Sequence, residues 1–70
     1  MTFQQVTVTK WGPSRERSKT CLRRWALDDE AEIDQAVASA SWTSPSLLAK
    51  HAEALRACVE GCGGTAAIVG

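Results

Sequence analysis

Three cysteines and a single histidine are the residues of this chain whose chemistry could build a metal site. His51, Cys58 and Cys62 fall on or just after one predicted helix, and imidazole nitrogen and thiolate sulfur are the ligands that zinc prefers. A helix rises about 1.5 Å per residue, so seven residues separate His51 from Cys58 by about 10.5 Å. Ligands that must each come within about 2.0–2.3 Å of one ion cannot lie so far apart. The spacing therefore excludes a zinc ion shared by His51 and Cys58.

Cys21, Cys58 and Cys62 remain as a set of three thiols, and they lack the C-x-x-C spacing that is typical of structural zinc sites. We therefore expect no metal and no cofactor, with Cys58 packing as a small apolar residue of the core. An odd number of cysteines favours reduced thiols and a cytoplasmic location. A disulfide from Cys21 to Cys58 or to Cys62 stays open as the alternative.

Catalysis finds little support in the same residues. A nucleophilic cysteine needs a base within hydrogen-bond reach, and His51 shares its helix with Cys58 at the wrong height. The glycines at 61, 63 and 64 follow a helix, whereas phosphate-binding loops precede one. The sequence predicts that the protein is not an enzyme.

The charged residues are sorted along the chain, although 8 basic and 8 acidic side chains cancel overall. Residues 1–27 hold six basic residues against Glu16 alone, a net charge of +5, and residues 28–70 carry the opposite charge of −5. Such asymmetry bears on partners and on electrostatic steering rather than on fold. We expect the two groups of charges to stay exposed and unpaired, ready for another molecule.

This distribution predicts a small intracellular interaction protein that docks a charge-polarised surface onto a protein or ribonucleoprotein complex. By analogy of size, it could be a phage- or mobile-element-encoded inhibitor of a host nucleic-acid machine, of the anti-CRISPR type. Tryptophans would anchor the contact, because buried aromatic residues concentrate binding energy. The candidate partner-binding residues are Trp11, Arg15, Arg17, Lys19, Arg23, Arg24, Asp29, Glu30, Asp34 and Trp42.

Two alternatives stay open for the charged segments. Residues 10–24 could bind nucleic acid, with arginines on phosphates and a tryptophan stacked on a base, although the isoelectric point near 6.5 is not that of a strongly basic domain. The basic residues could instead pair with the acidic ones, and the acidic residues could serve only to stabilise a helix start.

Periodicity predicts an α+β domain with the order ββααβ. Polar and apolar residues alternate over 3–11, and residues 20–27 resume an extended pattern in which Arg23 interrupts one apolar face and Arg24 the other. We interpret residues 3–27 as a β-hairpin with a solvated loop. Helices follow at 29–41, with Asp29 as its cap, and at 45–60, with Ser44 as cap and Pro45 in the first turn. Residues 65–69 are predicted to form a short final strand.

Seventy residues are enough for one domain with one small core. The beginning of the chain lacks the pattern of a signal peptide, and no apolar run approaches the roughly 18 residues that cross a bilayer. We therefore expect a soluble protein that does not bind membranes. It would be a monomer, or a homodimer that pairs exposed strand edges.

Overall fold

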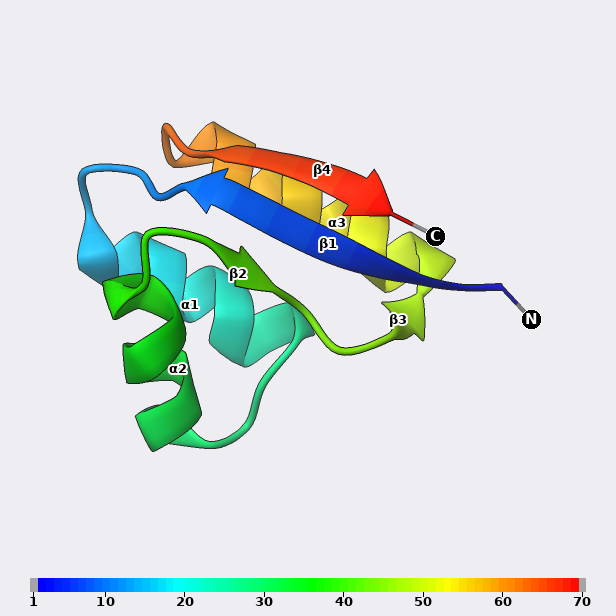
Figure 1. Cartoon of the computed structure of the whole chain (residues 1–70), viewed down its shortest axis with the longest axis horizontal. Helices are drawn as coiled ribbons and strands as arrows, with labels where there is room; N and C mark the ends of the chain where they lie inside the picture. Colours follow the sequence, from blue (N-terminus) through cyan, green and yellow to red (C-terminus); the bar gives the residue numbers. More distant parts are fainter. Residues whose placement is uncertain (1, 70) are drawn as a thin grey trace.

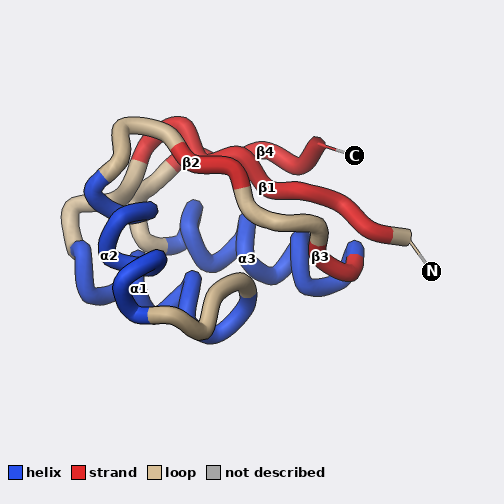
Figure 2. Tube along the Cα trace, turned by 60° about the horizontal axis from the view of Figure 1, so that its bottom comes forward, coloured by secondary structure: helices blue, strands red, loops and turns tan. Residues whose placement is uncertain are grey.

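The computed structural model describes residues 2–69 and has an α+β fold, which confirms the predicted class. In chain order the elements are β1 (Phe3–Lys10), α1 (Arg15–Trp25), α2 (Glu30–Ala38), β2 (Trp42–Thr43), β3 (Leu47–Leu48), α3 (Ala49–Gly61) and β4 (Thr65–Val69). The sheet forms one layer and the helices lie on one side of it (Figures 1 and 2).

β1 is the central strand of the sheet, and β2, β3 and β4 each pair with it in antiparallel orientation. Thr7 lies opposite Thr43 of β2 and also opposite Ala67 of β4, so β1 runs between these two strands (Figure 1). The final strand predicted at 65–69 is therefore confirmed. Between α3 and β4 the chain turns at Gly63. The φ of this residue is 93°, a conformation that glycine adopts without a steric penalty.

The core lies between the sheet and the helices. α3 packs against β1 and β4, while α1 packs against both α3 and α2. Every layer contributes fully or almost fully buried apolar side chains: Val6, Val8, Cys21, Leu22, Ile33, Ala36, Val37, Ala52, Leu55, Val59 and Ala66.

The hairpin predicted at 3–27 is wrong in its loop and its second strand, because α1 occupies Arg15–Trp25 and residues 20–25 are its second half. The Ser14 hydroxyl accepts a hydrogen bond from the Arg17 backbone N–H and caps the helix. Ser18, Cys21 and Leu22 are buried at the i, i+3, i+4 spacing of a helix. An alternating pattern leaves an arginine on each face of a strand, whereas the helical period turns every arginine of this segment away from the core.

The last helix begins at Ala49 rather than at Pro45. Ser44, the predicted helix cap, is buried and bonded to β1 instead: its hydroxyl accepts from the Val6 N–H at 2.8 Å, and its own N–H donates to the Val6 carbonyl at 2.8 Å. Leu47–Leu48 then pairs with Phe3 and Gln4 before the helix starts. A serine before a proline suits a helix cap, but the neighbouring strand takes its hydrogen bonds here.

Candidate functional site

α1 carries all five basic residues that the sequence singled out: Arg15, Arg17, Lys19, Arg23 and Arg24. The helix divides them between two sides. Residues at i, i+4 share a face, which turns Lys19 and Arg23 toward α2. Arg17 and Arg24 are seven residues apart, so they share a different face of α1 and lie about 10.5 Å apart along its axis.

The side of α1 that faces α2 is paired with acidic residues. Arg23 donates to both carboxylate oxygens of Glu30, at 2.7 and 2.8 Å, and the Lys19 ammonium lies 2.7 Å from the Asp34 carboxylate. The hydrogen bond from Arg23 lowers the pKa of Glu30, and the hydrogen bond to Asp34 raises the pKa of Lys19. The expectation that all the charges stay unpaired is therefore wrong for these four predicted site residues.

Among the residues that the structure describes, the other three of these five basic residues of α1 are not paired with acidic residues. Arg15, Arg17 and Arg24 are exposed, and within residues 2–69 none of them takes part in an ion pair. The Arg24 guanidinium lies 5.9 Å from the centre of the Trp25 ring, close enough for a cation–π contact. We call Arg17 and Arg24 the arginine face of α1.

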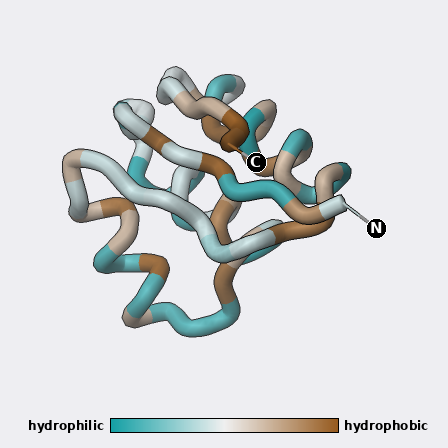
Figure 3. The backbone as a smooth tube through the Cα atoms, turned by 45° about the vertical axis from the view of Figure 1, so that its right-hand side comes forward, coloured by the Kyte–Doolittle hydropathy of each residue, from teal (hydrophilic) through white to brown (hydrophobic). Residues whose placement is uncertain are grey.

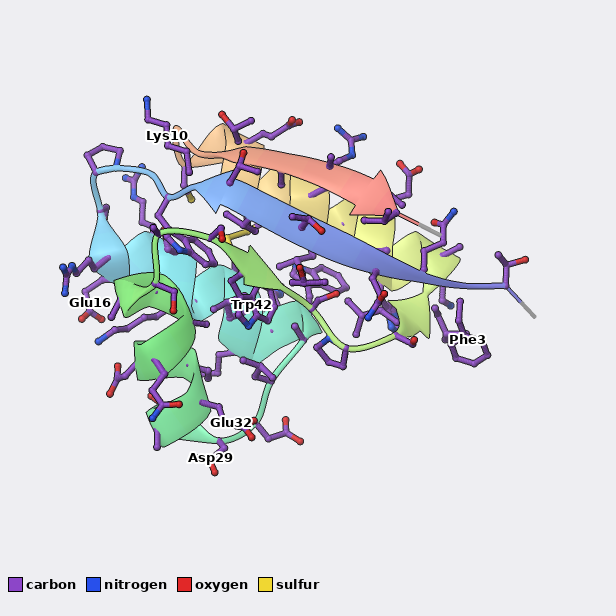
Figure 4. The ribbon with its side chains drawn as sticks, viewed as in Figure 1. Phe3, Lys10, Glu16, Asp29, Glu32 and Trp42 are labelled. Atoms are coloured by element: carbon purple, nitrogen blue, oxygen red, sulfur yellow. A yellow bond between two sulfur atoms is a disulfide. The ribbon has the colours of Figure 1, made fainter. Side chains whose placement is uncertain are left out.

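Acidic residues lie just before α2 and in its first turns. We call them the acidic pole: Asp28, Asp29, Glu30, Glu32 and Asp34. Asp29 caps this helix, since its carboxylate accepts from the Ala31 N–H at 2.9 Å. Asp29 and Glu32 lie at the lower end of the molecule in Figure 4, and the turn that precedes α2 is a hydrophilic stretch in Figure 3. Part of this pole therefore stabilises its own helix, as one of the alternatives from the sequence anticipated.

The two tryptophans predicted as anchors lie together. The ring centres of Trp11 and Trp42 are 6.0 Å apart, and the Trp11 indole N–H donates to the Ser39 carbonyl at 3.0 Å. Trp42 lines a surface groove of about 410 Å³ between α2 and the β2–β3 segment, whereas Trp11 lies beside Trp42 and is not among the residues that line the groove. The groove is lined by Leu27, Glu32, Gln35, Ala36, Ser39, Trp42 and Pro45. It could accept an apolar side chain of a partner.

The cysteines depart from the expectation of reduced thiols. A disulfide joins Cys21 of α1 to Cys58 of α3, and Cys62 is the free thiol. This is one of the two pairings that the sequence left open, and Cys58 is only partly buried. Helical spacing in α1 would have indicated it, because it places Cys21 on the inner face that meets α3.

His51 does not join this sulfur cluster. Its ring lies against Trp25, with ring centres 5.8 Å apart, and the cluster of potential metal ligands found in the described part of the chain contains the three cysteines alone.

No family model, no curated protein and no solved structure matches this chain. Among the described residues, no helix is both long and apolar enough to cross a membrane. β4 has β1 as its one partner strand in that part of the chain, so its outer edge is open. Whether this edge pairs with a second copy stays a prediction.

Proposed function

We propose that this protein is a non-enzymatic binding module whose arginine face docks onto an acidic surface of a larger protein. The observation that carries the proposal is that Arg17 and Arg24 share one exposed side of a helix whose other side is already paired and packed. A surface charge without an internal partner contributes little to the fold, and it is free to direct association.

The fold holds this face in a fixed orientation. The Cys21–Cys58 disulfide attaches α1 to α3 on one side, and the Lys19–Asp34 and Arg23–Glu30 pairs attach it to α2 on the other. A binding surface that is ordered before association loses less conformational entropy when it binds. An inhibitor that acts by occupying a surface of a larger machine would work in this way.

A protein partner fits the charges better than nucleic acid does. Duplex DNA presents one negative charge per about 1.7 Å of its axis, and such a uniform row would meet exposed carboxylates near both ends of α1. Glu16 lies beside Arg17, and Asp28 and Asp29 follow the end of the helix. A protein surface can place acidic residues opposite the arginines and leave room for these carboxylates.

Absence of catalysis is part of the proposal. It is supported by the position of His51 against Trp25, where the ring is not grouped with the thiols. A cysteine nucleophile needs a base within hydrogen-bond reach. His51, the one histidine, is not grouped with Cys62 or with the disulfide cysteines.

The test compares two charge reversals with equal effects on net charge. Arg17→Glu with Arg24→Glu removes the arginine face, and Lys10→Glu with Lys50→Glu changes two exposed lysines elsewhere. Fluorescence anisotropy measures binding of a labelled polyglutamate peptide and of a labelled DNA duplex at two salt concentrations. We expect the peptide to bind the wild type and the lysine variant alike, and to bind the arginine variant about tenfold more weakly, or about 1.4 kcal/mol.

Equal losses in both variants, or no peptide binding at low salt, would overturn the proposal. Tighter binding of the duplex than of the peptide, with a steep salt dependence, would support the nucleic-acid alternative instead. Circular dichroism of each variant checks that the fold is retained.

A further inference from the structure

Three sulfur atoms from two helices converge beside the arginine face. Cys21 comes from α1, while Cys58 and Cys62 come from α3 and its C-terminal cap. The Sγ atoms of all three lie within 4.8 Å of one another, and those of Cys21 and Cys62 are 3.9 Å apart. The disulfide uses two of these atoms and leaves the third sulfur next to it.

The separations suit a metal ion bound by thiolates. Zinc–sulfur bonds of about 2.3 Å at tetrahedral angles place two ligating sulfurs about 3.8 Å apart. Cys58 and Cys62 are four residues apart at the end of α3, so the helix brings their side chains to one face. Reduction breaks the bond between the Cys21 and Cys58 sulfurs and leaves them free to move apart, with their Cα atoms 5.9 Å from each other in the oxidised protein.

The position of the cluster also permits an ion to enter. A surface hollow of about 280 Å³ is lined by the three cysteines together with Glu16, Arg17 and Thr20. Cys58 and Cys62 are partly exposed there, whereas Cys21 is buried. Three thiolates around a divalent ion keep one excess negative charge, and the guanidinium of Arg17 at the rim would offset it.

We propose that the reduced protein binds one thiophilic d¹⁰ cation, of the kind represented by Zn²⁺ and Cu⁺, through Cys21, Cys58 and Cys62. Thiolate ligands select such ions over Mg²⁺ or Ca²⁺. Three protein ligands on zinc leave the fourth position for water or another ligand, while a monovalent copper ion is satisfied by three sulfurs.

Metal binding and the disulfide exclude each other. A dithiol reductant transfers two electrons and two protons to the Cys21–Cys58 bond, which yields two thiols and the oxidised, disulfide form of the reductant. Binding of the cation then releases the three thiol protons, because the thiolate is the ligand. The site therefore operates only under reducing conditions.

The experiment measures metal binding to the full chain in both redox states. Native mass spectrometry counts bound Zn²⁺ or Cu⁺, and competition with a chromophoric chelator gives the affinity. We expect one ion per reduced chain, none on the oxidised chain, and an increase in melting temperature when the reduced chain takes up Zn²⁺. The Zn²⁺ and Cu⁺ arms, run separately, decide which ion binds more tightly.

Two variants locate the site. Cys62→Ser keeps the disulfide pair, so its oxidised form remains a folded control. In the reduced form it should bind at least about 100-fold more weakly, since even changes outside the ligand set typically cost 10–100-fold. His51→Ala should bind as the wild type does. The proposal is overturned if the reduced wild type binds no more tightly than Cys62→Ser, if the oxidised protein binds equally well, or if His51→Ala loses the ion.

Discussion

The guanidinium of Arg23 and the carboxylate of Glu30 form two parallel hydrogen bonds, of 2.7 and 2.8 Å, between the end of α1 and the start of α2. Together with the Lys19–Asp34 pair, they neutralise part of the charge asymmetry. From the sequence alone, these charges are expected to stay unpaired and to contact a partner. Under the proposed function, fewer charges are therefore left for a partner: the arginine face of α1, and the exposed carboxylates of Asp28 and Asp29 before α2.

The Glu30 pair should make stability depend on pH on the acidic side. Arg23 lowers the pKa of Glu30 below its ordinary value of 4.5 in the folded protein. The contribution is therefore present above 4.5 and is lost as pH falls through the lower folded pKa. Glu30→Gln should reduce the melting temperature slightly at neutral pH and leave it unchanged at a pH well below 4.5. Glu32→Gln, an exposed carboxylate on the same helix, is the matched control, and an equal effect of both variants would refute the assignment.

Lys19 should act at the opposite end of the pH scale. The hydrogen bond to Asp34 raises the pKa of Lys19 above 10.5 when the protein is folded. Its contribution is complete below 10.5 and disappears as pH rises through the folded value. Asp34→Asn should lower the melting temperature at neutral pH, and thermal unfolding followed by circular dichroism should show that the difference from wild type closes in strong base. A constant difference across this range would mean that the pair is not responsible.

Ser44→Ala should destabilise the protein by about 1–3 kcal/mol, because the buried Val6 N–H loses the hydroxyl that accepts its hydrogen bond. Ser46→Ala, at an exposed position two residues later, should change stability little. Urea unfolding of the two variants measures the difference. Similar midpoints for both would show that Ser44 does not hold this segment on β1.

Glycines 12 and 61 should respond oppositely to alanine. A Cβ at Gly12 would overlap the backbone carbonyl of Cys62, so Gly12→Ala should cost about 1–3 kcal/mol. A Cβ at Gly61 meets open space at the end of α3, and Gly61→Ala should gain up to about 1 kcal/mol of helix propensity. Chemical denaturation measures both, and a neutral Gly12→Ala would contradict the close approach of the β1–α1 turn to the end of α3.

Reduction of the disulfide should lower the free energy of unfolding by about 2–5 kcal/mol in the absence of metal ions, since the bond closes a loop across 37 positions of a small domain. Thermal unfolding with and without a phosphine reductant measures the loss. Cys62→Ser should keep this sensitivity to the reductant, and the double variant Cys58→Ser with Cys62→Ser should abolish it. If Cys62→Ser also became insensitive, the pairing would have to involve Cys62.

The sequence by itself determined the parts of this protein whose pattern is local. Alternation in β1 and the apolar final strand follow from which side chains must face a core, and the Asp29 cap follows from its place before a helical stripe. The same local reasoning failed over residues 20–27, because the strand interpretation accepted an arginine on each face. A helix instead turns Arg23 and Arg24 outward and buries Ser18, Cys21 and Leu22.

Only the tertiary structure decided how distant residues meet. Whether Arg23 pairs with Glu30, and whether Cys21 bonds Cys58 or Cys62, depends on how α1 rotates against α2 and α3. That rotation is set by packing of the whole core, in which no single segment carries the information. The charged residues and the cysteines could therefore be identified from the sequence. The residues with which they pair could be assigned only from the positions of the helices relative to one another.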